Sequence, residues 1–439
     1  MDPAQGQEAS ELDAALGALR SRDYPLARER FHDLATRGDG QAMAYLGLIH
    51  LRALGTPYDP DQAFEWTERA ARTGLASAEL TLAHLSYLGI GPPRNPGQAA
   101  RLLLASARTG HAPALRTLGL VYLGLGAGWR GLGERCLEAA SAQRDLFAVH
   151  AIASLRLIRG EPARALPLLA WAGTQGFYPS LLHLKRLQQT MGTEAVRRLA
   201  IADPDYPGRP QALDLPEFPW DPAPSPQGRL LDPRIGLRIQ ERLLDAVECD
   251  YLIALAAPAL RPSETREPGS GRIVKNPLCA SSAMNFPPNL EDLVVFRLEE
   301  RIATWCGTAL DAAEPLAVLR YRPGEEYRPH FDAFDDKILA ADPEGIRLGQ
   351  RTATVLTDLN GDFTGGETAF PALGTQVRPE TGQALVFGNV DGKGARNPLA
   401  LHAECPVLNG EKWLATLWFR ARAGARRWNP AALGPSAPT

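Results

Sequence analysis

Two histidines, one aspartate and one lysine in the C-terminal half have types and spacing that could do chemistry. His330 and Asp332 stand at i and i+2 in YRPGEEYRPHFD, so on a β-strand both side chains leave the same face and can bind one ion. His402 follows 72 residues later in LALHAECPV, and Lys412 lies ten residues beyond it. Two histidines and one carboxylate, with no thiolate beside them, are the ligand set typical of non-haem Fe(II) oxygenases, which keeps coordination positions open.

Lys412 is informative because only five of the 47 basic residues in the chain are lysines. Strand alternation in KWLATLWFR defines two faces: Lys412, Leu414, Thr416 and Trp418 on one, and Trp413, Ala415, Leu417 and Phe419 on the other. The second face is wholly apolar and is expected to lie against outer helices, which turns Lys412 inward. A buried ammonium is costly unless it meets an anion. No acidic residue alternates with Lys412 on this strand, so we expect the carboxylate of a bound ligand to be its partner.

The segments around these residues predict a β-fold with flanking helices. From Ala317 on, the strand-like runs AVLRY, TATVLTDL, GGETAFP, QALVF and KWLATLWFRAR are separated by turns that carry Gly, Pro and Asn. With no helix expected between them, they predict a closed or double-sheet fold such as a jelly roll. Residues 230–260 predict a short strand and a helix, and residues 290–307 predict a second amphipathic helix. The polar residues 261–277 are either a surface loop or a lid over the substrate.

The N-terminal half is predicted to be a stack of helix pairs. Gly38, Gly74 and Gly110 fall 36 residues apart and close the similar phrases LATRG, AARTG and SARTG. A period of this length indicates helical units that cover each other's apolar faces. In one such unit, Asp59 or Asp61 is placed to cap the second helix, and Gly74 to end it in a left-handed conformation.

The other histidines and the cysteines do not suggest a further metal site. Six histidines are scattered through the helical half without HExxH-like spacing, so we expect them to have core or surface roles: His32, His50, His84, His111, His150 and His183. Five cysteines, an odd number without CxxC or zinc spacing, predict free thiols in a reducing compartment.

Length and composition favour a soluble protein of several domains. The chain has 439 residues and a formal net charge of −3, so no global field attracts nucleic acid or an anionic membrane. The N-terminus lacks the features of a secretory leader, and no run is apolar for long enough to span a membrane. We therefore expect a cytoplasmic protein without nucleic-acid or membrane partners. The expected parts are a repeat domain at 12–203, a Pro-rich linker at 204–228 and a catalytic domain at 229–424.

The linker prediction rests on eight prolines between Pro204 and Pro226. Such a density of missing backbone donors excludes helix and sheet and favours an extended, semi-rigid connector. Tyr206, Phe218 and Trp220 could attach it to a neighbouring domain.

The ordered runs YRPGEEYRPHFD, QRTATVLTDLN, GGETAFP, ALVFGNV and LHAECPVLNGEKWLATLWF resemble the prolyl 4-hydroxylase branch of the 2-oxoglutarate/Fe(II) oxygenases. The resemblance covers about residues 229–422 and implies a double-stranded β-helix that uses Fe(II), 2-oxoglutarate and O2, with ascorbate as a candidate auxiliary cofactor. The site residues that it implies fall into two groups: iron ligands His330, Asp332 and His402, and residues for the distal carboxylate of 2-oxoglutarate, Lys412, Tyr321 and Thr368.

By the same resemblance, Tyr327, Arg351 and Trp418 lie near the substrate. Arg420 joins this group because many relatives carry a histidine at its position, two residues past Trp418. Core packing is the alternative role for Tyr327 and Trp418, and a solvated strand edge is the alternative for Arg351.

The repeats AYLGLIHLRALG, QAFEWTERAARTG, AELTLAHLSYLGIG and QAARLLLASARTG resemble Sel-one-like repeats, a branch of the tetratricopeptide-like solenoids. Such an array either selects a protein substrate on its concave surface or serves oligomerisation or stability. The expected function is hydroxylation of a prolyl residue in a recruited protein or peptide. The alternatives are hydroxylation of a free amino acid or small natural product, and a repeat scaffold whose oxygenase domain has decayed.

Overall fold

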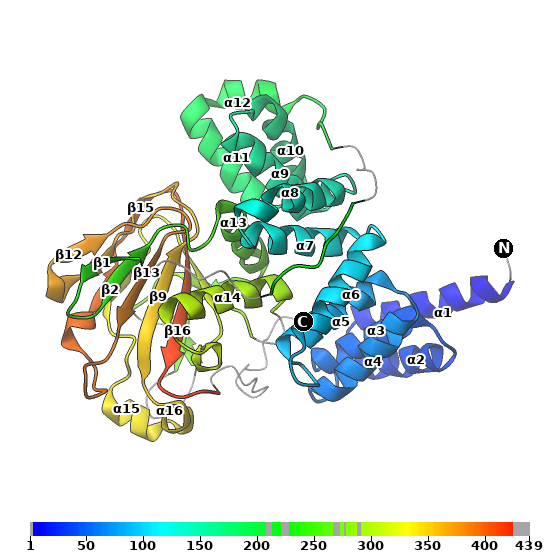
Figure 1. Ribbon diagram of the computed structural model, residues 1–439, viewed down its shortest axis with the longest axis horizontal. Helices are drawn as coiled ribbons and strands as arrows, with labels where there is room; N and C mark the ends of the chain where they lie inside the picture. The colour runs from blue at the N-terminus through cyan, green and yellow to red at the C-terminus, as the bar shows by residue number, and fades with distance from the viewer. Residues whose placement is uncertain are drawn as a thin grey trace.

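A helical N-terminal half lies beside a β-rich C-terminal half in the computed structural model (Figure 1). The structure describes residues 3–207, 213–220, 228–266, 273–275, 278–287 and 291–424. The helices of the N-terminal half, in chain order, are α1 (Pro3–Arg20), α2 (Tyr24–Thr36), α3 (Gly40–Leu51), α4 (Pro60–Arg72), α5 (Ala76–Leu88), α6 (Pro96–Arg108), α7 (Ala112–Gly124), α8 (Ala127–Ser141), α9 (Leu146–Ile158), α10 (Pro162–Thr174), α11 (Tyr178–Met191) and α12 (Thr193–Ala200).

The predicted helix pairs are confirmed, and α3 with α4 shows how the sequence forms one unit. Of the two candidate caps, Asp59 is the N-cap of α4, because its carboxylate accepts a hydrogen bond from the Gln62 amide at 3.0 Å. Pro60 occupies the first turn, where a missing amide proton costs nothing. Gly74 follows the helix with φ of +81°, a left-handed conformation that glycine adopts without strain. Gly38 and Gly110 have the same conformation one repeat before and after it.

The described parts of the linker contain no helix or strand, and they lie against the repeats through their aromatic residues. Trp220 contacts Tyr87 with ring centroids 4.5 Å apart, and Phe218 meets Tyr122 edge to face at 5.4 Å. The Tyr122 hydroxyl also donates to the Pro216 carbonyl at 2.8 Å. The aromatic attachment expected from the sequence is therefore present.

Among the described residues, the C-terminal half contains two main antiparallel sheets, which face each other as a double-stranded β-helix, and two additional two-stranded sheets. The larger sheet has the strand order β1-β2-β13-β9-β16-β7-β6-β3, and the smaller has the order β12-β11-β14-β8. The strands are β1 (Arg229–Asp232), β2 (Leu237–Gln240), β3 (Arg261–Pro262), β4 (Glu264–Arg266), β5 (Ile273–Lys275), β6 (Ser282–Asn285), β7 (Ala317–Tyr321), β8 (Tyr327–His330), β9 (Arg351–Asp358), β10 (Thr364–Gly365), β11 (Thr368–Phe370), β12 (Thr375–Val377), β13 (Ala384–Gly388), β14 (His402–Glu404), β15 (Val407–Asn409) and β16 (Lys412–Arg420).

The two faces of β16 are used as the alternation predicts. Leu414 and Trp418 belong to the apolar cluster between the sheets. The opposite face packs against α13 (Ala246–Ala256) and α14 (Leu293–Cys306), and it is formed by Trp413, Ala415, Leu417 and Phe419. Because side chains alternate along a strand, this burial fixes the inward direction of Lys412, which is fully buried.

Three sequence-based expectations are corrected or left untested. The expected absence of helices after Ala317 was wrong: α15 (Asp336–Ala341) and α16 (Pro343–Leu348) lie between β8 and β9. Their caps were visible in the sequence, since Asp335 accepts from the Lys337 amide and Asp342 from the Gly345 amide. Two strands, not one, precede α13. In the 261–277 segment β4 pairs with β5, while residues 267–272 and 276–277 lie outside the described residues, so the lid stays a prediction.

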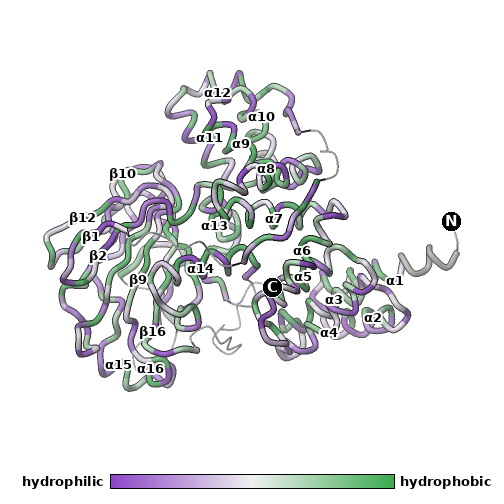
Figure 2. The backbone as a smooth tube through the Cα atoms, viewed as in Figure 1, coloured by the Kyte–Doolittle hydropathy of each residue, from purple (hydrophilic) through white to green (hydrophobic). Residues whose placement is uncertain are grey.

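One continuous apolar core joins the two halves. It combines buried residues of α5–α10 with those of α13 and α14 and the outer face of β16. The apolar residues of α9 and α13 appear green where the halves meet (Figure 2). Polar contacts cross the same boundary: the Tyr87 hydroxyl donates to Glu300 at 2.5 Å, and Arg94 pairs with Glu300 at 2.7 Å. All five cysteines are free thiols, and no described helix is long and apolar enough to cross a membrane.

We expect Phe218→Ala to lower the stability of the contact between linker and repeats. Removal of a buried aromatic ring costs about 3–5 kcal/mol when the cavity does not collapse. The measurement is the melting temperature together with limited proteolysis near residue 218. Phe218→Leu is the matched control and should retain most of the stability. Equal melting temperatures for wild type and Phe218→Ala would contradict this account.

Candidate metal and cosubstrate site

The structure brings His330, Asp332 and His402 together at one point between the sheets. His330 and His402 are directly opposite each other in the register of β8 against β14. Their Nε2 atoms lie 3.7 Å and 3.6 Å from the two Asp332 carboxylate oxygens. Strand β8 ends at His330, so Asp332 lies just past the strand rather than on it, yet its carboxylate still reaches the same point. The three groups can therefore ligate one ion.

Hydrogen bonds orient these three side chains. The Nδ1 atoms of His330 and His402 face the carbonyls of Arg328 and Ala400 at 2.9 Å and 3.0 Å. A carbonyl can only accept, so each Nδ1 carries the proton and each Nε2 presents a lone pair to the centre. The Thr354 hydroxyl donates to Asp332 Oδ2 at 2.5 Å.

The protonation states also suit metal binding. Burial, and then the neighbouring His402, lower the pKa of His330 to about 4, so its imidazole is neutral near pH 7. Burial acts to raise the pKa of Asp332, but the two imidazoles and Arg351 keep it below its ordinary value. Imidazole nitrogens and one carboxylate are the donors that Fe(II) takes in facial-triad sites.

The residues predicted to hold 2-oxoglutarate form a second buried cluster beside the triad. Lys412 of β16 is opposite Tyr321 of β7 in the larger sheet, and Thr368 of β11 is opposite Glu404 of β14 in the smaller sheet. Lys412 forms an ion pair with Glu404 across the interior and donates to the Gly366 carbonyl at 2.7 Å. The Thr368 hydroxyl donates to Glu404 at 2.9 Å. The two sheets thus bring Lys412, Tyr321 and Thr368 together around the carboxylate of Glu404.

No acidic residue alternates with Lys412 on its own strand, as the sequence shows, but other strands supply two acidic neighbours: Glu404 from β14 and Asp358 from β9. A ligand carboxylate as a partner of Lys412 stays a prediction. The Asp358 carboxylate lies 3.7 Å from Nζ, at ion-pair distance. Glu404 could have been recognised, because it stands at i+2 from His402 and a strand turns both to one face.

The charges of this cluster are strongly coupled. Burial acts to lower the pKa of Lys412, but Asp358 and Glu404 raise it above its ordinary value, so the amine is charged. Burial raises the pKa of Asp358 to about 7 against the opposing effect of Lys412, and Glu404 adds to the rise. Asp358 is therefore balanced between its neutral and ionised forms near neutral pH.

The cluster retains a polar atom suited to a further acceptor. The Tyr321 side chain is buried, and its hydroxyl meets only the weakly hydrogen-bonding Cys279 thiol, with no oxygen or nitrogen partner among the described residues. A buried hydroxyl without a strong partner is costly, and the carboxylate of a bound ligand could accept from it. Lys412 and Tyr321 thus fit a dicarboxylic cosubstrate.

The predicted substrate residues form an aromatic and cationic cluster. Arg351 makes two hydrogen bonds to Glu314, at 2.8 Å and 2.6 Å, and its guanidinium lies 4.1 Å from the Trp418 ring centroid. Arg420 donates to the same Glu314 at 3.0 Å. Because Arg351 is largely buried in this pair, the alternative of a solvated strand edge is wrong. The Tyr327 ring stacks on His330, with centroids 3.5 Å apart. Contact with a substrate stays a prediction for all four residues.

Comparison with known proteins agrees with this fold. A family model described as the 2OG-Fe(II) oxygenase superfamily matches residues 316–420, and the Sel1 repeat model matches residues 40–75 and 76–111. The chain is 34% identical over 202 residues to probable prolyl 4-hydroxylase 4 of Arabidopsis thaliana, covering 41% of this chain and 66% of that protein. It is 36% identical over 195 residues to prolyl 4-hydroxylase 1 of the same plant, covering 41% of this chain and 67% of that protein.

The chain therefore belongs to the 2OG-Fe(II) oxygenase superfamily, among its prolyl 4-hydroxylase-like enzymes, and carries Sel1 repeats in its N-terminal half. The family implies Fe(II), 2-oxoglutarate and O2 as cofactors. The chain spans 66% of the length of the first of these relatives.

Solved structures that are similar to parts of this chain include a prolyl hydroxylase and a Sel1 repeat protein. The 2-oxoglutarate complex of the viral collagen prolyl hydroxylase from Paramecium Bursaria Chlorella virus-1 is 28% identical and covers 42% of this chain and 96% of that chain, with a TM-score of 0.33. The Sel1 repeat protein from Oxalobacter formigenes is 17% identical and covers 43% of this chain and 83% of that chain, with a TM-score of 0.38.

We expect Lys412→Ala to weaken 2-oxoglutarate binding and Glu404→Gln to strengthen it. The alanine variant loses a charge-assisted contact of about 1.5–3 kcal/mol, or roughly 10- to 100-fold in affinity. The glutamine variant removes the acid that competes for Lys412. The measurement is calorimetric titration of the Fe(II)- or Mn(II)-loaded protein with 2-oxoglutarate, with bound metal quantified in parallel. Weaker binding in both variants would show that Glu404 supports the cosubstrate site instead of competing within it.

We also expect 2-oxoglutarate affinity to fall as pH rises through about 7. Above this pH Asp358 is ionised, and its charge repels the incoming carboxylate beside Lys412. The raised pKa of Asp358 also affects the free energy of unfolding. The protonated carboxyl stabilises the folded state at low pH, and this stabilisation is lost as pH rises from about 4, the pKa in the unfolded chain, to about 7, the pKa in the folded protein. Asp358→Asn should flatten the pH dependence of binding. A pH profile that is identical in wild type and variant would remove Asp358 as its cause.

Proposed function

We propose that the protein is an Fe(II)- and 2-oxoglutarate-dependent dioxygenase that hydroxylates a prolyl residue in a protein or peptide. The observation that carries the proposal is the juxtaposition of the His330, Asp332 and His402 ligand set with Lys412 and Tyr321 in one barrel interior. The similarity to prolyl 4-hydroxylases supports the choice of a prolyl substrate.

In this proposal the protein binds, orients and shields the reactants. His330, Asp332 and His402 hold the metal, while Lys412 and Tyr321 fix the distal carboxylate of 2-oxoglutarate. When bound, iron and 2-oxoglutarate supply the oxidising power that inserts one oxygen atom of O2 into a C–H bond, with release of succinate and CO2. The apolar side chains between the sheets, such as Phe370 and Leu414, exclude water from this chemistry.

The part of the site that faces the substrate is expected to bind the proline ring and the polar backbone beside it. Tyr327, stacked on His330, and Trp418, covered by the Arg351 guanidinium, offer flat surfaces beside the metal ligands. Arg351 and Arg420 share Glu314, which is a single carboxylate between two cations. Such a positively charged rim favours substrate carbonyls or acidic neighbours of the target proline.

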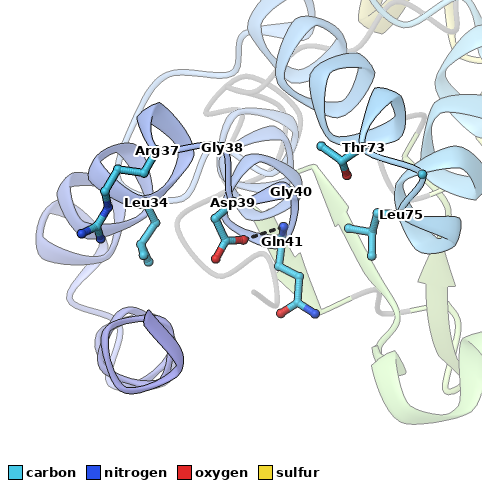
Figure 3. Close-up of a pocket in the computed structure, with 9 residues that line it drawn as sticks. Leu34, Arg37, Gly38, Asp39, Gly40, Gln41, Thr73 and Leu75 are labelled. Carbon is cyan, nitrogen blue, oxygen red and sulfur yellow. Dashed lines mark hydrogen bonds between the residues drawn. The ribbon is translucent and has the colours of Figure 1, made fainter. Parts of the chain in front are cut away.

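The repeats are proposed to recruit the protein that carries the target proline. A hollow of about 460 Å³ lies where the turn between α2 and α3 meets the turn between α4 and α5 (Figure 3). Charged, uncharged polar and apolar residues line it, and the polar ones include Arg37, Asp39, Gln41 and Thr73. None of these helices contributes to the metal site. In this proposal, the surface that binds the protein substrate and the site of the chemistry are therefore separate parts of the molecule.

The test is turnover of 2-oxoglutarate by the full-length protein in the presence of different substrates. We expect succinate release to rise with proline-containing peptides, with a mass increase of about 16 Da on the peptide, as insertion of one oxygen atom requires. Asp332→Ala is the inactive control. Stimulation by free amino acids but not by peptides would replace the prolyl substrate with a small molecule. No turnover and no Fe(II) binding would support the decayed-domain alternative.

A further inference from the structure

A second group of two histidines and one carboxylate lies between the repeats and the oxygenase domain. His150 comes from α9, His183 from α11 and Asp250 from α13. His150 Nε2 lies 3.0 Å from Asp250 Oδ2, and His183 Nε2 lies 3.3 Å from Asp250 Oδ1. Two helices of the repeats and the first helix of the oxygenase domain thus converge on one carboxylate. This cluster could not be predicted from the sequence, because the three residues share no local spacing.

One ligand atom from each of the three residues lies within 4.8 Å of the others, so a single metal ion could bridge them. Ligand atoms at the corners of a tetrahedron with bonds of about 2.1 Å lie roughly 3.4 Å apart. Besides the two contacts of Asp250, Ser154 Oγ lies 3.4 Å from both His150 Nε2 and Asp250 Oδ2. The cluster is more closely spaced than the triad of His330, where the corresponding distances are 3.7 Å and 3.6 Å.

The surroundings orient these donors and leave one route of access. Ser180 Oγ lies 2.9 Å from His150 Nδ1 and can accept a hydrogen bond from the Nδ1–H group, which leaves the lone pair on Nε2 for a metal. His150 is fully buried, while Ser154 and Asp250 are 4% and 6% exposed. The His183 side chain retains 24% exposure, so an ion can enter beside it.

We propose that His150, His183 and Asp250 form a structural zinc site that joins the repeats to the oxygenase domain. Two imidazole nitrogens and a carboxylate oxygen are ligands that zinc accepts. The joining role is inferred from the position of the three ligands, which come from two helices of the repeats and one helix of the oxygenase domain. Ser154 or a water molecule completes the tetrahedron.

Without metal the same residues form a hydrogen-bonded ion pair. Burial acts to lower the pKa of His183, but Asp250 reverses this effect and raises it.

The site would also link the repeats to the cosubstrate cluster. Helix α11 carries both His183 and Tyr178, and the Tyr178 hydroxyl donates to Glu411 at 2.5 Å, next to Lys412. The Tyr178 ring contacts Trp413 on the same strand, with centroids 5.5 Å apart. A metal that fixes α11 against α13 thereby fixes the contact of α11 with the start of β16.

The test is metal binding by the full-length protein after the iron site is disabled with His330→Ala and His402→Ala. We expect this chelator-treated background variant to bind about one Co²⁺ per chain, with the intense visible bands of four-coordinate cobalt, and Zn²⁺ to displace it. Adding His183→Ala should abolish the bands. Adding His111→Ala, which removes a half-buried histidine elsewhere in the repeats, should leave them unchanged.

Elemental analysis of the wild-type protein gives a second readout that does not depend on folding of the variants. We expect zinc in addition to iron in the purified protein, and a higher melting temperature of the background variant with Zn²⁺ than without it. The proposal is overturned if the background variant binds no Co²⁺, or if His183→Ala binds as much as its parent. The cluster would then be a metal-free ion pair. Either result leaves the proposed oxygenase function intact, because the metal ligands differ.

Discussion

The ion pair of Lys412 with Glu404 is the interaction on which the arrangement of the site depends. It connects the larger sheet to the smaller one through the interior of the barrel, where both side chains are shielded from water. An unpaired charge there would cost several kcal/mol, so the two sheets cannot separate or slip without exposing it. The register that results places Tyr321 beside the amine and Thr368 beside the carboxylate.

The same ion pair affects how tightly a cosubstrate can bind. Lys412 already has one carboxylate at contact distance and a second, Asp358, at 3.7 Å. A dicarboxylic ligand would add a third acid, which the interior accepts more easily if one of the three is protonated. Asp358 can take that proton, because its pKa is about 7. Cosubstrate affinity in this site is therefore a property of the whole charge cluster and not of Lys412 alone.

Sequence reasoning succeeded where a single element determines the outcome. The alternation of β16 gave the inward direction of Lys412, and the capping of α4 by Asp59 follows from local chemistry. The convergence of His330, Asp332 and His402 could be predicted because these residues combine rare types in one order. Contacts between helices or strands that lie far apart in the sequence could not be predicted. Glu404 meets Lys412 from another sheet, and His150 meets Asp250 from another domain, so neither contact leaves a periodic signal in the chain.

The continuity of the core decides how the repeats relate to the chemistry. If the two halves touched only through the linker, the repeats could rotate freely and serve merely to raise the local concentration of a substrate. Instead α13 and α14 share an apolar core with α5–α10, and polar contacts such as that of Tyr178 with Glu411 reach the start of β16. Contacts of this kind fix the orientation of the repeats relative to the barrel. In the proposed recruitment of a protein substrate, the repeats would therefore contribute geometry as well as affinity, because the distance between a docking surface and the target residue would have to match this fixed orientation.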